Sequence, residues 1–104
     1  LFENFIISEL LKNQFNKGAV DNLFYWRDKT GHEVDLLVDH ASQLTAIEIK
    51  SGATIAGDFF KGLNYFAALS TTRTSKVLLY GGSQSQERTD GTLIRPWNKL
   101  DGLA

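Results

Sequence analysis

Two acidic residues and one lysine in the middle of the chain have the types and spacing that could carry out chemistry. Asp35 lies in an alternating apolar run that predicts a β-strand, and Glu48 and Lys50 lie in a second run of this kind. A short polar loop joins the two runs, which predicts a hairpin. If Ala41 and Ser42 form the centre of its turn, Asp35 lies directly across from Glu48, with Cβ atoms about 4.5–5.5 Å apart.

The faces of the two expected strands, about 32–39 and 44–50, follow from the alternation, because side chains two residues apart point to the same side. Asp35 is expected opposite one row of aliphatic residues, and Glu48 and Lys50 opposite another. These rows are Val34, Leu36 and Val38 in the first strand, and Ile47 and Ile49 in the second. A one-residue slip of the hairpin would instead place the two acids on opposite faces.

Two carboxylates directly across a strand pair repel, which destabilises a sheet unless a cation lies between them. Lys50 is one candidate, and the three residues then form an ion-paired, solvated face of an ordinary hairpin. A divalent metal is the other, since Mg²⁺ is typically held by one or two carboxylates. Leu37 and Ala46, expected on the same face, favour a site partly shielded from water.

The same residues carry a family resemblance. The run from Gly31 to Asp35, followed by Glu48-Ile49-Lys50, resembles the Asp…Glu-x-Lys signature of the PD-(D/E)XK nuclease superfamily, which includes restriction endonucleases, archaeal Holliday junction resolvases and RecB-type nucleases. Over residues 1–80 the chain is most similar to the nuclease-like domain of unknown function found C-terminal to AAA-type ATPases in bacteria and archaea. The segments that carry this similarity are Phe2-Glu3-Asn4, Tyr25-Trp26-Arg27, Gly31-His32-Glu33-Val34-Asp35 and Ile47-Glu48-Ile49-Lys50-Ser51.

This resemblance implies metal-dependent hydrolysis of DNA phosphodiesters, with Mg²⁺ or Mn²⁺ as the cofactor. The ligands that it implies for the ion are Asp35, Glu48, the backbone carbonyl of Ile49 and Glu3. Lys50 would orient or deprotonate a water molecule, or stabilise the charge of the phosphorane. The alternative is a non-catalytic arm of an ATPase that keeps the nuclease fold and binds DNA or a partner, because a fold does not by itself imply a function.

Residues outside the central hairpin are also candidates for the site. Glu3 falls within the apolar stripe of an expected first helix, where it needs a partner or a metal, but it is also placed as an ordinary first-turn acid; Glu9 is the second acid of that helix. Arg27 lies beside aromatic residues in the expected strand 23–28. These residues could bind substrate, or they could be ordinary half-buried residues of the sheet. Lys61 and Tyr65 resemble the Gln-x-x-x-Tyr of RecB-like nucleases, which places Tyr65 near substrate and leaves Lys61 as a surface lysine.

The expected elements follow the order α-β-β-β-α-β, with one further strand near the end. The pattern predicts an α/β domain, a mixed sheet flanked by helices on both faces, and the resemblance makes it restriction-endonuclease-like. The expected helices are 1–16 and 58–70; the strands are 23–28, the hairpin pair, 76–80 and 92–95; and 83–91 is expected to be a polar loop.

Composition limits the class of protein. The 104 residues predict a single domain spanning 1–104, with a net charge of −1 and no cysteine. No apolar run approaches the roughly 18 residues of a membrane span, no signal peptide is seen, and a cytoplasmic location is expected. Because the chain starts at Leu1 and has no Met, we expect a fragment of a longer ATPase. The near-neutral charge gives no support for strong non-specific binding of nucleic acid, although a local patch or a metal could supply the positive field.

Overall fold

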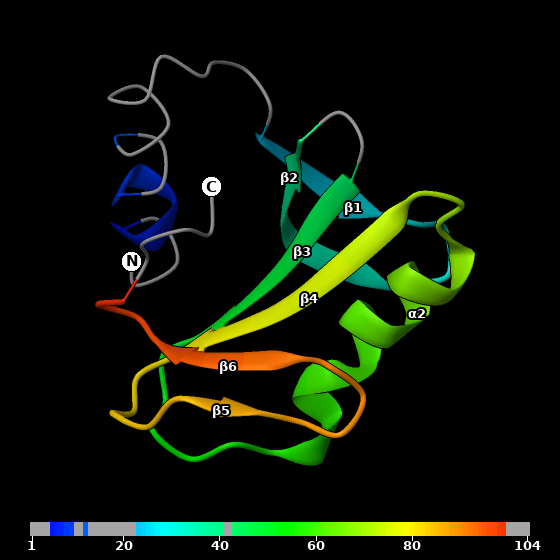
Figure 1. Cartoon of the computed structure of the whole chain (residues 1–104). Coiled ribbons are helices and arrows are strands. Elements are labelled where there is room, and N and C mark those ends of the chain that lie inside the picture. The colour runs from blue at the N-terminus through cyan, green and yellow to red at the C-terminus, as the bar shows by residue number, and fades with distance from the viewer. Residues whose placement is uncertain (1–4, 10–11, 13–22, 41–42, 100–104) are drawn as a thin grey trace.

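Six strands form one mixed sheet at the centre of the protein (Figure 1). The structure, a computed structural model, describes residues 5–9, 12, 23–40 and 43–99. The spatial order is β1-β2-β3-β4-β6-β5. The strands are β1 (Leu23–Arg27), β2 (Glu33–Asp39), β3 (Gln43–Lys50), β4 (Arg73–Tyr80), β5 (Gln86–Glu87) and β6 (Leu93–Pro96). Strands β3, β4 and β6 run parallel, whereas β1, β2 and β5 pair antiparallel with their neighbours.

A helix covers each face of this sheet (Figure 1). On one face, the short 3₁₀ helix η1 (Gly57–Phe60) leads into α2 (Lys61–Leu69), which buries Leu63 and Phe66. On the other face, residues 5–9 are helical and Ile6 is fully buried against the sheet. The structure therefore confirms the expected α/β class, with a mixed sheet between helices.

Burial on both faces explains the composition of the central strands. The run from Thr45 to Ile49 in β3 is buried throughout, as is the run from Val77 to Tyr80 in β4. Such near-continuous apolar runs are typical of strands covered on both sides. Glu48 is the one charged residue in these two runs, and its position therefore needs an explanation beyond packing.

The hairpin register agrees with the prediction from the sequence. Leu36 pairs with Ile47, and Asp39 pairs with Leu44, which is the pairing required by a turn centred between residues 41 and 42. The two turn residues themselves lie outside the described part of the chain. Continued by one residue, the same register places Asp35 opposite Glu48.

The predicted face of Val34 is wrong. The β1–β2 pairing shifts between Phe24 and Trp26, which is an irregularity of the β-bulge kind. Val34 packs with the cluster under α2, whereas Leu36 and Val38 pack with Ile6 on the opposite face. The simple alternation of side chains between the two faces of β2 therefore fails near Asp35, where the pairing of β2 with β1 is irregular.

The C-terminal part contains a strand that the sequence analysis missed. Residues 83–91, expected to be a polar loop, include β5, which pairs with β6. The turn between them contains Asp90 and Gly91, and Gly91 has a φ of +89°. An Asp-Gly pair is a recognised hairpin signal, because glycine adopts this left-handed conformation without steric cost. Strand β4 also begins at Arg73, earlier than the predicted 76.

Candidate functional site

Asp35 is held against β3 by a hydrogen bond to the backbone. Its Oδ2 accepts a hydrogen bond from the backbone N–H of Ile49 at 2.8 Å. The contact lies just beyond Leu36–Ile47, the last pair of the β2–β3 ladder, so the side chain satisfies a donor that no β2 carbonyl reaches there. This bond fixes the carboxylate of Asp35 beside Glu48.

Glu48 is an unusual acid, because it is buried and incompletely satisfied. The residue is 8% exposed, and its Oε1 is buried without a hydrogen-bond partner among the described residues. Leaving a buried polar atom unpaired costs roughly 1–3 kcal/mol, and more for a charged group. A cation or a proton at this position would remove the cost.

The pKa of Glu48 reflects the same environment. Burial, and after it the negative charge of Asp35, raise this pKa to about 8, although the ammonium of Lys50 opposes the rise. A protonated Glu48 also donates a hydrogen bond to Asp35, which two carboxylates cannot form. At neutral pH the pair therefore retains one proton unless a cation takes its place.

Lys50 lies at the end of β3, on the same side as Glu48. Its Nζ is 3.7 Å from Glu48 Oε2, and it lies 5.2 Å from the ring centroid of Phe59 in η1. The side chain is 37% exposed, whereas that of Glu48 is 11% exposed. Lys50 therefore lies between the buried acid and solvent.

The donor set fits a hydrated divalent ion. No group of three or more His, Cys, Asp or Glu side chains capable of holding a metal is found in the described residues. Two carboxylates and the backbone carbonyl of Ile49 are, however, the oxygen ligands that Mg²⁺ and Mn²⁺ prefer, with water completing the shell. The buried Oε1 of Glu48, for which the described part of the chain supplies no hydrogen-bond partner, is compatible with such an ion.

The acids of the first helix add little to this picture. Glu3 lies outside the described residues, so its predicted part in a metal site stays a prediction. Glu9 is described, and its Oε2 forms an ion pair with Lys12 Nζ at 3.2 Å.

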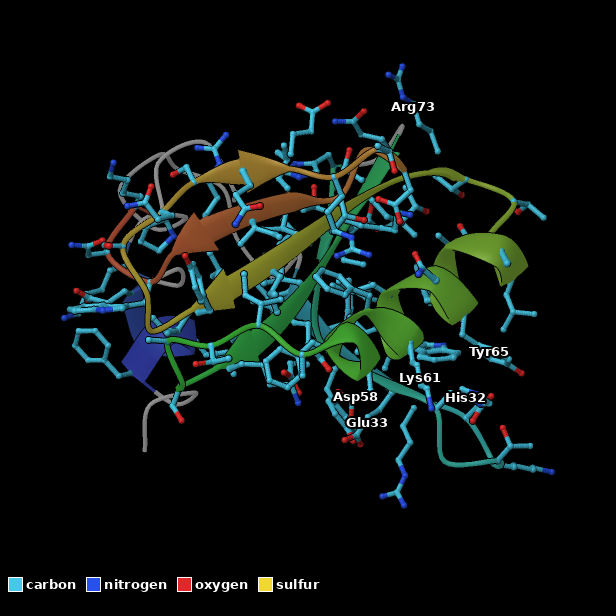
Figure 2. The ribbon with its side chains drawn as sticks, turned by 90° about the horizontal axis from the view of Figure 1, so that it is seen from below. His32, Glu33, Asp58, Lys61, Tyr65 and Arg73 are labelled. Atoms are coloured by element: carbon cyan, nitrogen blue, oxygen red, sulfur yellow. The ribbon has the colours of Figure 1, made fainter. Side chains whose placement is uncertain are left out.

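Tyr65, in α2, packs against the turn between β1 and β2. Its ring stacks on His32, with centroids 3.6 Å apart and planes 2° apart (Figure 2). The ring centroid of Tyr65 also lies 6.3 Å from that of Trp26. The exposed Lys61 precedes Tyr65 by one helical turn, as its interpretation as a surface lysine requires. Arg27 is exposed at the end of β1, opposite Glu33. A role for Arg27 or Tyr65 in substrate binding stays a prediction.

The sequence analysis assigned no part in the site to Tyr25 or Glu33. The hydroxyl of Tyr25 in β1 donates a hydrogen bond to Glu33 Oε2 at 2.5 Å. This bond is the main cause of a raised pKa of Tyr25, and the charges of Glu33 and Asp35 add to the rise. The site therefore extends from Asp35 to an exposed tyrosine on the edge strand. The cross-strand proximity of Tyr25 and Glu33, eight residues apart, was the signal that could have found the pair.

No curated protein and no solved structure matches this chain. Among the described residues, no helix has the length and apolar character needed to cross a membrane. One family profile matches residues 1–100, and its description is "Domain of unknown function (DUF4143)". Because this match covers almost the whole chain, the protein belongs to the DUF4143 family.

Proposed function

We propose that Asp35, Glu48 and Lys50 form a site for metal-dependent hydrolysis of DNA phosphodiesters. The observation that carries the proposal is the buried Oε1 of Glu48, which has no hydrogen-bond partner among the described residues although Asp35 lies beside it. A structural acid in this position would be expected to have its oxygens satisfied by the fold. An acid that binds a cation, in contrast, keeps one oxygen free of hydrogen bonds from the protein so that this oxygen can contact the cation.

The chain's own residues divide the work. Asp35, oriented by the N–H of Ile49, and Glu48 would hold the ion, with the carbonyl of Ile49 as a third ligand. When bound there, Mg²⁺ or Mn²⁺ supplies Lewis-acid chemistry, which lowers the pKa of a water and neutralises charge on the phosphate. Lys50, 3.7 Å from Glu48 and open to solvent, orients or deprotonates the attacking water, or stabilises the phosphorane charge.

DNA as the substrate rests on the resemblance to PD-(D/E)XK nucleases. An AAA-type ATPase as the neighbour in the same polypeptide rests on the resemblance to the nuclease-like domain found C-terminal to such ATPases. The net charge of −1 gives the domain no strong general attraction for DNA. The positive field must therefore be local, from Lys50 and the bound cation. An ATPase would supply further affinity by holding the domain on its substrate.

A nicking assay on supercoiled plasmid, paired with calorimetric titration of Mg²⁺ and Mn²⁺, tests the proposal. Wild type should bind the ion and nick the plasmid, and neither should occur with Asp35→Asn. The matched control is Asp58→Asn, since Asp58 is an exposed acid in η1. Metal-independent nicking, or nicking that survives Asp35→Asn, would contradict the proposal.

A second candidate function rests on the raised pKa of Glu48. A proton shared by Asp35 and Glu48 satisfies the pair without any metal, and the domain then serves as a non-catalytic arm that binds DNA or a protein partner. In this case millimolar Mg²⁺ leaves the melting temperature unchanged. Lys50→Ala should then destabilise the fold, because the acids lose their neighbouring cation. A rise of the melting temperature with Mg²⁺, absent in Asp35→Asn, decides for the metal site.

A further inference from the structure

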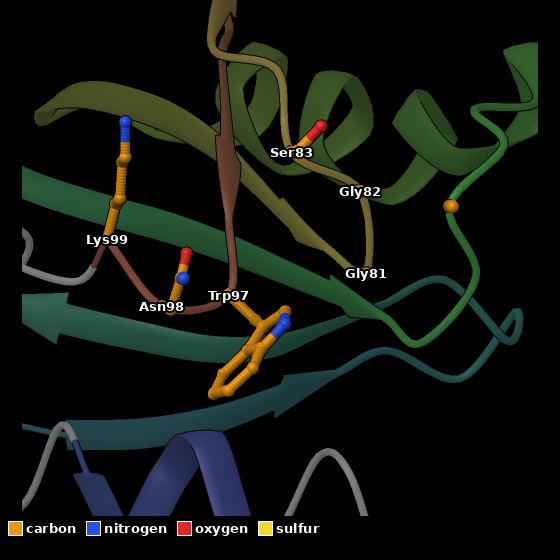
Figure 3. A pocket seen from close by; sticks show the side chains of 7 residues that line it. Gly81, Gly82, Ser83, Trp97, Asn98 and Lys99 are labelled. Carbon is orange, nitrogen blue, oxygen red and sulfur yellow. The ribbon is translucent and has the colours of Figure 1, made fainter.

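A pocket with a volume of about 450 Å³ opens at the carboxyl ends of the parallel strands (Figure 3). Three segments that are distant in the sequence line it: Ala53 after β3, residues 81–83 after β4 and residues 97–99 after β6. Ligands of open α/β sheets commonly bind outside this edge of the sheet. The volume lies within the range of small-molecule sites, about 300–1,000 Å³.

Hydrogen bonds hold the walls of this pocket in place. The N–H of Gly81 donates to the carbonyl of Gly52, and the N–H of Trp97 donates to the carbonyl of Tyr80, both at 2.9 Å. The hydroxyl of Tyr80 donates to the carbonyl of Gln84 at 2.9 Å and accepts from its N–H at 3.1 Å. The loop after β4 is therefore fixed at both ends, and the pocket is preformed.

The floor of the pocket requires glycine. A Cβ at Gly81 would overlap the carbonyl oxygen of Ser51, and a Cβ at Gly82 would overlap the ring of Tyr80. Because no side chain fits at either position, the loop closes tightly on its neighbours and leaves the space above it open. Ser51 directly follows Lys50, and Lys50 pairs with Tyr80 in the β3–β4 register. The pocket therefore borders the proposed hydrolytic site.

The lining of the pocket has the chemistry of an anion site beside an aromatic ring. Among the described residues of the lining, Lys99 is the charged one and none is an acid, and Ser83 and Asn98 add a hydroxyl and an amide. In Figure 3 these three side chains point the same way, whereas the indole of Trp97 points to the other side. The indole is supported edge-on by Phe5, with centroids 5.7 Å apart, and Trp97 remains 36% exposed.

We propose that this pocket binds one nucleotide of single-stranded DNA, with the phosphate on Lys99, Ser83 and Asn98 and the base against Trp97. The inference rests on the proposed function and extends it, because it names unpaired DNA beside the scissile phosphate as the substrate. Proteins that bind single strands combine a positive groove with aromatic rings on which bases stack. A base within a duplex is already stacked on both sides and cannot offer its face to Trp97.

The test is fluorescence anisotropy of a labelled ten-nucleotide oligothymidylate in EDTA, so that no cleavage occurs. Trp97→Ala should raise the Kd about 5- to 100-fold, and Trp97→Phe should restore most of the affinity. Lys99→Gln should weaken binding and reduce the slope of log K against log salt by about 0.7, the value for one phosphate of a single strand.

Matched controls come from the far end of the sheet. Phe24→Ala removes an exposed aromatic ring from β1, and Lys29→Ala removes an exposed lysine from the β1–β2 turn. Both should bind like wild type. Circular dichroism of each variant checks folding. If Trp97→Ala does not fold, the affinities of the conservative variants Trp97→Phe and Lys99→Gln still test the inference.

Equal affinity of wild type, Trp97→Ala and Lys99→Gln would overturn the inference. The inference would also be overturned if a DNA duplex bound as tightly as the single strand and its binding depended on Trp97 and Lys99. Thymidine monophosphate that competes as well as the oligonucleotide would show a site for free nucleotides instead. Binding that depends on Trp97 without any Mg²⁺-dependent nicking refutes the proposed hydrolysis alone, whereas nicking without dependence on Trp97 refutes the pocket alone.

Discussion

The carboxylate of Asp35 bridges from β2 to the backbone N–H of Ile49 in β3, at 2.8 Å. This bond places a charged side chain where the antiparallel ladder ends, directly beside the buried Glu48. The arrangement orients one acid by the backbone and leaves an oxygen of the other without a partner among the described residues. Three predictions test what this arrangement does, and a fourth tests the packing of α2 on β2.

Replacing Asp35 by Asn should abolish metal binding while preserving the fold. The amide oxygen of Asn still accepts the N–H of Ile49, and its NH₂ group can donate to Glu48, so the repulsion between two acids disappears. The free energy of unfolding without metal should therefore hold or rise, while Mg²⁺ affinity falls and nicking is lost. Urea unfolding and calorimetry measure these quantities, with Asp58→Asn as the control. A loss of several kcal/mol of stability without metal would instead assign Asp35 a purely structural role.

Replacing Lys50 by Ala should separate chemistry from metal binding. Lys50 Nζ lies 3.7 Å from Glu48 Oε2, so its removal takes away a competing cation and leaves metal affinity equal or slightly higher. The nicking rate should still fall about 10²- to 10⁴-fold if Lys50 transfers a proton. Calorimetry and single-turnover nicking measure the two effects, and Lys29→Ala serves as the charge-matched control. Full activity of Lys50→Ala would remove Lys50 from the mechanism.

The pKa of Glu48 predicts that stability without metal falls as pH rises. The group titrates near 4.5 when unfolded and at about 8 when folded, so the native state binds more protons between these values. The stabilising contribution is fully present below pH 4.5 and is lost as pH rises through about 8, by a few kcal/mol in total.

Urea unfolding of wild type and Glu48→Gln across this pH window isolates the effect, because the amide does not titrate. Wild type should lose stability relative to Glu48→Gln as pH rises, and millimolar Mg²⁺ should reduce the loss. Parallel curves for the two proteins would mean that Glu48 is not perturbed by the fold.

Gly62 should be essential for the packing of α2 on β2. A Cβ at this position would overlap the backbone oxygen of Glu33, which cannot move away as a side chain could. Gly62→Ala should therefore lower the free energy of unfolding by about 1–3 kcal/mol, in spite of the higher helix propensity of alanine. Gly57→Ala is the control, because a Cβ there meets nothing within 4 Å. A stabilised Gly62→Ala would show that α2 does not approach β2 so closely.

Local patterns were sufficient for the central hairpin. The turn centre at residues 41 and 42 predicted the pairing of Leu37 with Ala46, because the register of a hairpin follows from the length of its loop. Alternation placed Glu48 and Lys50 on one face of β3, since that strand is regular from end to end. Likewise Leu63 and Phe66, three residues apart and therefore on one side of a helix, are the buried residues of α2.

Tertiary packing decided what alternation could not. The irregular β1–β2 pairing moved Val34 to the face under α2 and freed Asp35 to reach Ile49. Burial of Glu48 depends on the layers above and below β3, so its raised pKa has no signature in the local sequence.

The pocket at Trp97 was likewise not predictable from local sequence patterns. Its walls come from three loops that meet because β3, β4 and β6 are parallel neighbours. The sequence by itself determined the central hairpin, its register and the acids and lysine that it carries. Only the tertiary structure decided which of these groups lie together and how far water reaches them, because desolvation and long-range contact arise from segments far apart in the chain.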